Sequence, residues 1–174
     1  IEIARREKRI LEGILNQIPH PVDYKPYPAI RYADPDPILK IIPKLKNLRI
    51  TGTHTDLRYL LHKYRIVITS RATSTICWCI MSEKPMVFIE TGDGYALRKK
   101  AKKSFKKSLF YFEEKKKGFQ KDILQFLSQP IEEIERQWHG KKSARMRLIN
   151  KFFSTPQTGA GYRAANEIIS SLNN

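Results

Sequence analysis

Apolar and charged residues recur along the chain in patterns that predict helices and short strands. From Ile3 to Ile18, isoleucine and leucine return at three- and four-residue steps among charged residues, which indicates an amphipathic helix that ends at Pro19. Six prolines from Pro19 to Pro37 then exclude regular helix. We expect a short strand and an extended loop there, followed by a helix that Asp36 caps, with Pro37 at its first position.

The middle of the chain predicts strands and helices in alternation. Short continuous apolar runs, separated by polar turns, indicate buried strands. The strands are expected at 48–51, 65–69, 85–90 and 109–112. The helices are expected at 56–64, 76–83, 96–108, 120–127, 131–138, 143–153 and 160–172. This alternation predicts an α/β fold with a Rossmann-like parallel sheet flanked by helices and a helical C-terminal segment.

Composition places the chain among folded domains. Of 174 residues, 41% are apolar and 10% aromatic, with 8 glycines and 10 prolines, which excludes disorder, collagen and a disulfide scaffold. No apolar run reaches the roughly 20 residues that cross a bilayer. Cys77 and Cys79 stand two apart and are expected to be free thiols. No histidine stands at ligand spacing from a cysteine or a carboxylate, so we expect no metal site.

Charge is the feature that sets the chain apart. It holds 33 Lys and Arg against 17 Asp and Glu, a net charge of +16, which predicts an anionic partner. Between Arg98 and Lys121, eleven basic residues stand with two acidic ones, a net +9. A solvated helix face and a patch for an anionic surface both fit this run, whereas nucleic acid is disfavoured because aromatic residues are not interleaved with the lysines. The residues of such a patch are Lys99, Lys100, Lys102, Lys103, Lys106 and Lys107.

A polar turn with the sequence TSRATST, at 69–75, is the strongest candidate for chemistry. It follows a buried strand and opens a helix, where ligands of open α/β sheets bind and where backbone N–H groups are unpaired. Its hydroxyls and guanidinium suit a phosphate or diphosphate, and they belong to Ser70, Arg71, Thr73, Ser74 and Thr75. Alternatively, Thr73 or Ser74 only caps the helix. The turn lacks the glycines of a dinucleotide fingerprint or a P-loop, which disfavours an NAD-binding domain and an NTPase.

The turn after the next strand has the sequence ETGDGY, at 90–95. Gly92 lets the backbone approach a ligand closely, while Glu90 and Asp93 are candidates to accept hydrogen bonds from sugar or ribose hydroxyls. A plain strand-to-helix turn explains the same residues.

Two earlier turns add candidates at the ends of other strands. KPYPAIR, at 25–31, offers Lys25 and Arg31 to a phosphate, and TGTHTD, at 51–56, offers His54 to a sugar or ribose, although a helix cap explains TGTHTD as well. Since the carboxyl ends of parallel strands share one edge, the four turns together predict a site for a phosphorylated, hydroxyl-rich ligand. No catalytic triad or carboxylate pair is evident, so catalytic residues stay unassigned.

The order of elements and several short motifs resemble the C-terminal, nucleotide-binding half of a GT-B glycosyltransferase, and within it the CDP-glycerol glycerophosphotransferase and bacterial surface-carbohydrate transferase group. YKPYP stands where that group has Lys-x-His-Pro, with Tyr27 in place of the histidine. TSRATST stands at a Thr-Asp-Tyr-Ser-Ser type motif, with Arg71 where Asp or Tyr is usual. Lys84 and Pro85 match a Lys-Pro before a strand. GDGY matches a Gly/Asp/Tyr turn, and INKFFSTPQTGAGYRAANEI is similar to the closing segment.

The resemblance implies a donor-binding domain over residues 22–174, preceded by a linking helix at 1–21. It implies that Ser74 and Thr75 hold the donor diphosphate with Lys25 nearby, without a metal or other cofactor. The acceptor site and the catalytic base are expected on an N-terminal domain that this chain lacks. Because the chain begins with Ile1 rather than Met, we expect it to be a piece of a longer protein that binds the donor but does not turn over alone.

On this resemblance we expect part of a transferase that moves a sugar or polyol phosphate from a nucleotide-sugar or CDP-polyol donor onto a surface polysaccharide, in the cytoplasm or peripherally at the inner face of the cell membrane. Two alternatives stay open. One is a non-catalytic basic α/β module that binds an anionic membrane surface or polymer. The other is a non-transferring enzyme of similar fold, such as a nucleotide-sugar epimerase, for which no catalytic carboxylates are assigned.

Overall fold

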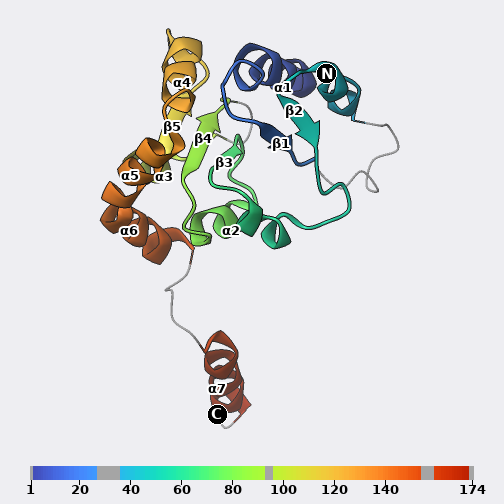
Figure 1. Cartoon of the computed structure of the whole chain (residues 1–174). Coiled ribbons are helices and arrows are strands. Elements are labelled where there is room, and N and C mark those ends of the chain that lie inside the picture. Colours follow the sequence, from blue (N-terminus) through green and yellow to red (C-terminus); the bar gives the residue numbers. More distant parts are fainter. Residues whose placement is uncertain (1, 27–35, 93–95, 154–158, 173–174) are drawn as a thin grey trace.

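Two small parallel sheets with helices around them form the body of the molecule (Figure 1). The computed structural model describes residues 2–26, 36–92, 96–153 and 159–172. The first sheet pairs β1 (Val22–Tyr24) with β2 (Leu48–Ile50). The second pairs three strands in the order β3 (Val67–Thr69), β4 (Met86–Glu90) and β5 (Phe110–Glu113). Every neighbouring pair is parallel, so the α/β fold expected from the sequence is confirmed.

The sequence predicts one sheet, whereas the structure has two. β1 and β3 are three residues long, and such short strands offer few backbone groups for a ladder. In the described ranges no ladder joins them. They still lie close to each other, because the hydroxyl of Tyr64, shortly before β3, donates a 2.9 Å hydrogen bond to Oδ2 of Asp23 in β1.

The N-terminal helix is shorter than expected and changes its period. α1 (Glu2–Ile10) passes directly into a π-helical turn, η1 (Leu11–Leu15), where the sequence predicts one amphipathic α-helix. In this turn the carbonyl of Gly13 accepts a 2.9 Å hydrogen bond from the side chain of Gln120. Ile10, Leu11 and Ile14 are buried in the core that the two sheets share, so this segment packs against the rest of the chain.

Each of two expected helices is replaced by a pair of short 3₁₀ turns. The helix expected after Asp36 is replaced by η3 (Pro37–Lys40) and η4 (Ile42–Lys44), and the helix expected at 56–64 is replaced by η5 (Leu57–Tyr59) and η6 (Leu61–Lys63). The cap predicted for Asp36 is confirmed, since its Oδ1 accepts from the backbone N–H of Ile38 at 2.9 Å. An α-helix from Pro37 is not continued because Pro43 has no N–H to donate to the carbonyl four residues earlier.

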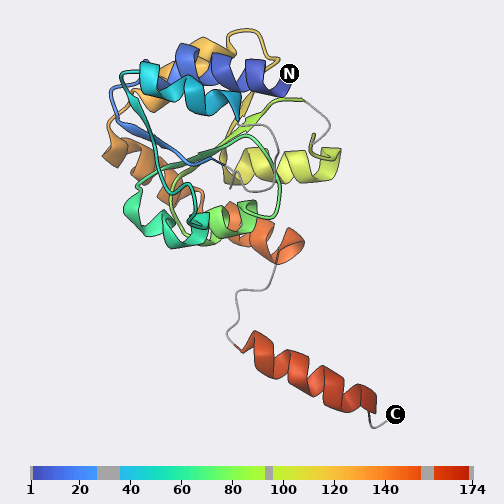
Figure 2. The same ribbon diagram turned by 90° about the vertical axis from the view of Figure 1, so that its right-hand side faces the viewer.

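The remaining helices lie within three residues of the expected bounds. They are α2 (Ile76–Met81), α3 (Lys99–Ser108), α4 (Phe119–Leu127), α5 (Ile131–Gly140), α6 (Lys142–Phe152) and α7 (Ala160–Leu172). Every residue of α7 is exposed, and the helix lies apart from the others in both views (Figure 1, Figure 2). In the described part of the chain, no helix combines the length and the apolar character needed to cross a membrane.

The core is centred on β4, whose five residues are all buried, as the continuous apolar run predicts. Phe88 of this strand packs edge-on against Phe105 of α3 and stacks on Tyr111 of β5, with ring centroids 5.3 and 5.6 Å apart. Trp138 of α5 is buried and donates its indole N–H to the carbonyl of Glu83 at 2.7 Å. These contacts fix β4 and its polar carboxyl end against the helices.

Candidate functional site

β1 and β3 lie next to each other where the two sheets adjoin (Figure 1). Asp23 of β1 accepts from Tyr64 before β3, and after β3 the charge of Arg71 acts on Tyr24 at the end of β1. β2 pairs with β1 on one side of this place, and β4 pairs with β3 on the other side. Successive strands are therefore added in opposite directions from it. In open α/β folds ligands bind outside the carboxyl ends of strands at such a switch point. We call this place the β1/β3 edge and define it by Lys25, Tyr24 and residues 69–75.

Glu7 of α1 lies at the β1/β3 edge and is absent from the residues proposed from the sequence. Its Oε1 accepts a 2.7 Å hydrogen bond from the hydroxyl of Tyr24. Burial raises the pKa of Glu7, and Asp36 adds to this, while the Tyr24 hydrogen bond and the charge of Arg71 act in the opposite direction. Burial also raises the pKa of Tyr24. The spacing of Glu7 to Ile10 and Ile14 is the signal that places it on the buried face of the helix.

The turn at 69–75 presents its hydroxyls outward. Ser70 and Arg71 are half-buried, whereas Thr73, Ser74 and Thr75 are exposed. The hydroxyls of Thr73 and Thr75 lie 3.3 Å apart. Thr75 occupies the cap position of α2 and makes no side-chain cap hydrogen bond, so the alternative in which Thr73 or Ser74 caps this helix is wrong.

Lys25 links the ends of β1 and β2. Its side chain passes Gly52, where an added Cβ would lie 3.3 Å from Cδ of Lys25, and its Nζ donates to the carbonyl of Pro26 at 2.7 Å. Burial lowers the pKa of Lys25, against the effect of Asp56, which raises it. His54 lies in the same turn and is exposed. The structure therefore brings Lys25 and the turn after β2 together, as the sequence predicts for neighbouring strand ends.

Two proposed residues lie outside the described residues. They are Arg31, a candidate phosphate contact, and Asp93, a candidate sugar contact. The motif position Tyr27 lies outside them as well.

Glu90 lies at the end of β4 and forms an ion pair with Lys102 of α3. It is 9% exposed and stands in register with Glu113 of β5. Nζ of Lys102 on α3 lies 2.5 Å from a carboxylate oxygen of Glu90 and 2.6 Å from one of Glu113, which also pairs with Lys106. The hydrogen bonds that Lys102 and Lys106 donate lower the pKa of Glu113, and donating to Glu113 and Glu90 raises the pKa of Lys102. Two lysines of the proposed patch thus neutralise strand-end carboxylates.

Gly92 follows β4 and adopts a positive φ of 65°, a conformation that favours glycine. A Cβ at this position would come within 2.9 Å of Cε of Lys115, whose ammonium lies 3.5 Å from the Gly92 carbonyl. In the structure, the group that closely approaches the Gly92 backbone is the Lys115 side chain. Lys115 therefore adds a cation to the ETGDGY turn that the strand-end pattern does not identify.

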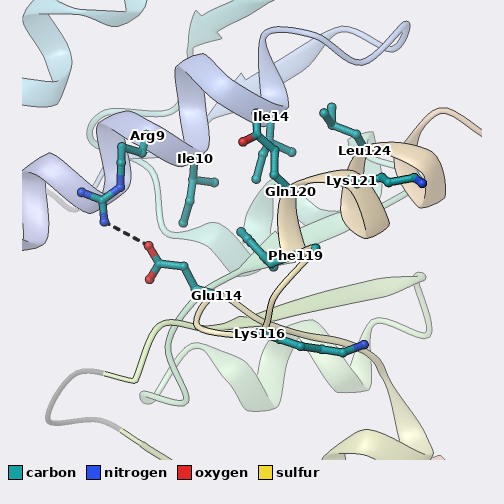
Figure 3. Close-up of a pocket in the computed structure, with 10 residues that line it drawn as sticks. Arg9, Ile10, Ile14, Glu114, Lys116, Phe119, Gln120, Lys121 and Leu124 are labelled. Carbon is teal, nitrogen blue, oxygen red and sulfur yellow. Dashed lines mark hydrogen bonds and ion pairs between the residues drawn. The ribbon is translucent and has the colours of Figure 1, made fainter.

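A hollow of about 880 Å³ lies between α1, η1 and α4 (Figure 3). Ile10, Ile14 and Leu124 form its apolar wall, and an ion pair of 3.2 Å joins Arg9 and Glu114 at its side. Lys116 and Lys121 of the basic run line it, whereas none of the candidate phosphate or sugar contacts does. We place the candidate site at the β1/β3 edge, because Lys25 and the turn at 69–75, the candidate phosphate contacts, follow the carboxyl ends of β1 and β3.

Among the described residues, no group of three or more His, Cys, Asp and Glu is placed to hold a metal ion. Cys77 and Cys79 are both free, and burial raises the pKa of the Cys79 thiol to about 11. The chain was also compared with known proteins. No protein-family model, curated protein or solved structure matches it.

Proposed function

We propose that the chain is the donor-binding part of a transferase that uses a nucleotide-activated sugar or polyol, on a Rossmann-like domain of the GT-B type. The observation that supports this most strongly is that Lys25 follows β1 and that the turn at 69–75, with its exposed hydroxyls, follows β3, while the charge of Arg71 in that turn acts on Tyr24 at the end of β1. Parallel α/β folds bind phosphorylated ligands at such an edge. The resemblance of several short motifs to those of the surface-carbohydrate transferase group favours the same function.

The diphosphate of the donor lies, in this proposal, against the turn between β3 and α2. Hydroxyls of Thr73, Ser74 and Thr75 donate to phosphate oxygens, and the guanidinium of Arg71 offers two parallel N–H donors. These donors compensate the negative charge that grows on the leaving diphosphate, which lowers the barrier by electrostatic stabilisation rather than by a covalent intermediate. Lys25 adds a second cation from the end of β1.

The acceptor, a surface polysaccharide, and the catalytic base belong in this proposal to a domain that precedes the chain in the whole protein. The ribose or sugar hydroxyls of the donor face the turns after β2 and β4, where His54 and Gly92 lie. The chain alone then binds the nucleotide and does not catalyse transfer.

Calorimetric titration of the chain with CMP, CDP, UDP and GDP tests the proposal. We expect one of the diphosphates to bind, and we expect Arg71→Gln to weaken it about ten-fold or more, the scale of a charge-assisted hydrogen bond. Arg136→Gln is the matched control, because Arg136 is an exposed arginine of α5 that pairs with Glu133. Absence of binding by all four nucleotides, with the fold intact, contradicts the proposal.

A further inference from the structure

The helices α3 and α6 lie side by side and run in opposite directions. At one end, Oγ of Ser108 donates to the carbonyl of Ala144 at 2.9 Å, and Nζ of Lys141 lies 3.5 Å from the carbonyl of Lys107. At the other end, Phe152, the last residue of α6, lines a cavity together with the first turn of α3. Both helices lie on the side of the molecule away from α1 (Figure 1).

Neither helix contains an Asp or a Glu. α3 carries six lysines, and α6 carries two lysines and two arginines. Three of these ten are used internally, since Lys102 and Lys106 bind strand-end carboxylates and Arg145 is buried with its guanidinium 3.8 Å from the Trp138 ring centroid. The other seven are exposed and make no ion pair with any described residue: Lys99, Lys100, Lys103, Lys107, Lys142, Arg147 and Lys151.

Five of the seven flank the contact between the helices. Arg147 and Lys151 follow Ala144 at steps of three and four residues, so they share the stripe of α6 that touches Ser108. On α3, three lysines also recur at steps of three and four residues and form one face. We call the five together the α3/α6 seam: Lys100, Lys103, Lys107, Arg147 and Lys151.

Apolar groups accompany the charge at one end of the seam. Phe152 is 39% exposed, and the cavity beside it, of about 550 Å³, has walls of Leu97, Ala96, Ala101 and Ala72 beneath Arg98 and Lys100. Cations around an exposed apolar group are typical of proteins that lie on anionic lipid, where lysines meet the headgroups and an aromatic side chain enters the interface. A single-stranded nucleic acid instead needs aromatic platforms between the cations, whereas the exposed aromatic residue of these two helices, Phe152, lies at one end of the seam.

We propose that the α3/α6 seam docks the chain on an anionic phospholipid bilayer, with Phe152 entering the interface between headgroups and acyl chains. The seam extends the lysine run of α3 to a second helix that is distant in the sequence. Ala72, which lies in the turn at 69–75, lines the same cavity as Phe152, so docking brings the β1/β3 edge to the membrane surface. This proposal does not depend on nucleotide binding.

Co-sedimentation with vesicles tests it on the full chain. We compare pure phosphatidylcholine with phosphatidylcholine that contains about 30% phosphatidylglycerol, at about 0.1 M salt. We expect the chain to bind only the anionic vesicles. Each seam lysine raises the partition coefficient onto the vesicles about five-fold. The triple substitution Lys100→Gln, Lys103→Gln, Lys107→Gln should therefore lower that coefficient about 100-fold. Phe152→Ser alone lowers it roughly ten-fold.

The matched control is Lys44→Gln, Lys46→Gln, Lys63→Gln, which removes the same charge from exposed lysines of η4, η6 and the turn before β2. Far-UV circular dichroism verifies that each variant is folded. Equal losses in the two triple variants contradict the proposal, because net charge alone then explains binding. Equal binding to neutral vesicles contradicts it too, as does retention of single-stranded RNA without retention of anionic vesicles at the same salt.

Discussion

Tyr24 at the carboxyl end of β1 donates its hydroxyl proton to Glu7 of α1, with 2.7 Å between the two oxygens. This contact connects the N-terminal helix to the candidate site, and it sets a carboxylate close to the arginine that we assign to the donor phosphate. The protonation of Glu7 is therefore coupled both to folding and to the charge at the β1/β3 edge.

The pH dependence of stability reports on Glu7. Because burial raises its pKa above the ordinary value of 4.5, the folded chain keeps a proton that the unfolded chain releases, and stability falls as the pH rises above 4.5 through the raised pKa. We expect the free energy of unfolding of Glu7→Gln to fall less than that of the unsubstituted chain over this window. Urea denaturation at several pH values measures it. Glu12→Gln is the control, and parallel curves for Glu7→Gln and the unsubstituted chain contradict the assignment.

Lys102 holds two carboxylates that face each other across β4 and β5. Replacing it with methionine leaves Glu90 and Glu113 as like charges in register, so we expect a loss of roughly 1–3 kcal/mol in the free energy of unfolding at neutral pH. The lowered pKa of Glu113 adds a pH signature, because its contribution is present above 4.5 and disappears as the pH falls through the lowered pKa.

Urea denaturation of Lys102→Met is compared with Lys103→Met, which removes an exposed lysine beside it. Adding Glu90→Gln to Lys102→Met removes one of the facing charges, and we expect it to restore part of the loss. If the two lysine substitutions lower the free energy of unfolding equally, the ion pairs of Lys102 with Glu90 and Glu113 do not stabilise the fold.

Asn47 joins the end of η1 to the start of β2. Its side-chain amide donates to the carbonyls of Leu15, Ile18 and His20 at 3.0, 3.1 and 2.7 Å. Asn47→Ala leaves these carbonyls unpaired, for an expected loss of about 1–3 kcal/mol. Asn47→Asp should cost more, because it aims an acceptor at three acceptors.

Thermal unfolding measures both Asn47 variants, with Asn150→Ala on the exposed face of α6 as the control. If Asn47→Asp is as stable as the unsubstituted chain, the hydrogen bonds of the Asn47 amide do not contribute to stability.

The hydroxyl groups of the turn at 69–75 make separate contributions to nucleotide affinity. Ser74→Ala and Thr75→Val should each weaken the diphosphate that binds about three- to ten-fold, the scale of one neutral hydrogen bond, and should leave the corresponding monophosphate less affected. Ser128→Ala, at the end of α4, is the control for an exposed hydroxyl outside the turn. Calorimetry with both nucleotides separates the two effects, and equal losses for monophosphate and diphosphate contradict the contact with the diphosphate.

The elements that local pattern decides could be predicted from the sequence. The apolar run at 85–90 indicates a buried strand, and β4 occupies Met86–Glu90. The segment at 56–64 was predicted as one helix and forms 3₁₀ turns, because the spacing of Leu57, Leu60 and Leu61 fits either type of helix. The division into two sheets depends on pairing between strands, on which the hydrophobic pattern gives no information.

The candidate site also contains some residues that the sequence predicts and others that only the structure identifies. The hydroxyls of the turn at 69–75 are visible in the sequence because strand, turn and helix are contiguous. The approach of Glu7 to Tyr24 and the bridge from Lys102 to Glu113 depend on how distant segments pack. A basic run such as that of α3 does not reveal which lysines bind internal carboxylates, so the exposed part of the patch is defined only by the structure.

The most direct test of the donor-site proposal is to follow backbone amide shifts of the ¹⁵N-labelled chain while CDP and UDP are added in turn. We predict that the largest shifts fall on the turn between β3 and α2, at Ser70 to Thr75, and on Gly52 beside Lys25, with the amides of α3 and α6 little changed. Shifts confined to α3 and α6, or to the hollow between α1 and α4, would contradict a donor site at the β1/β3 edge.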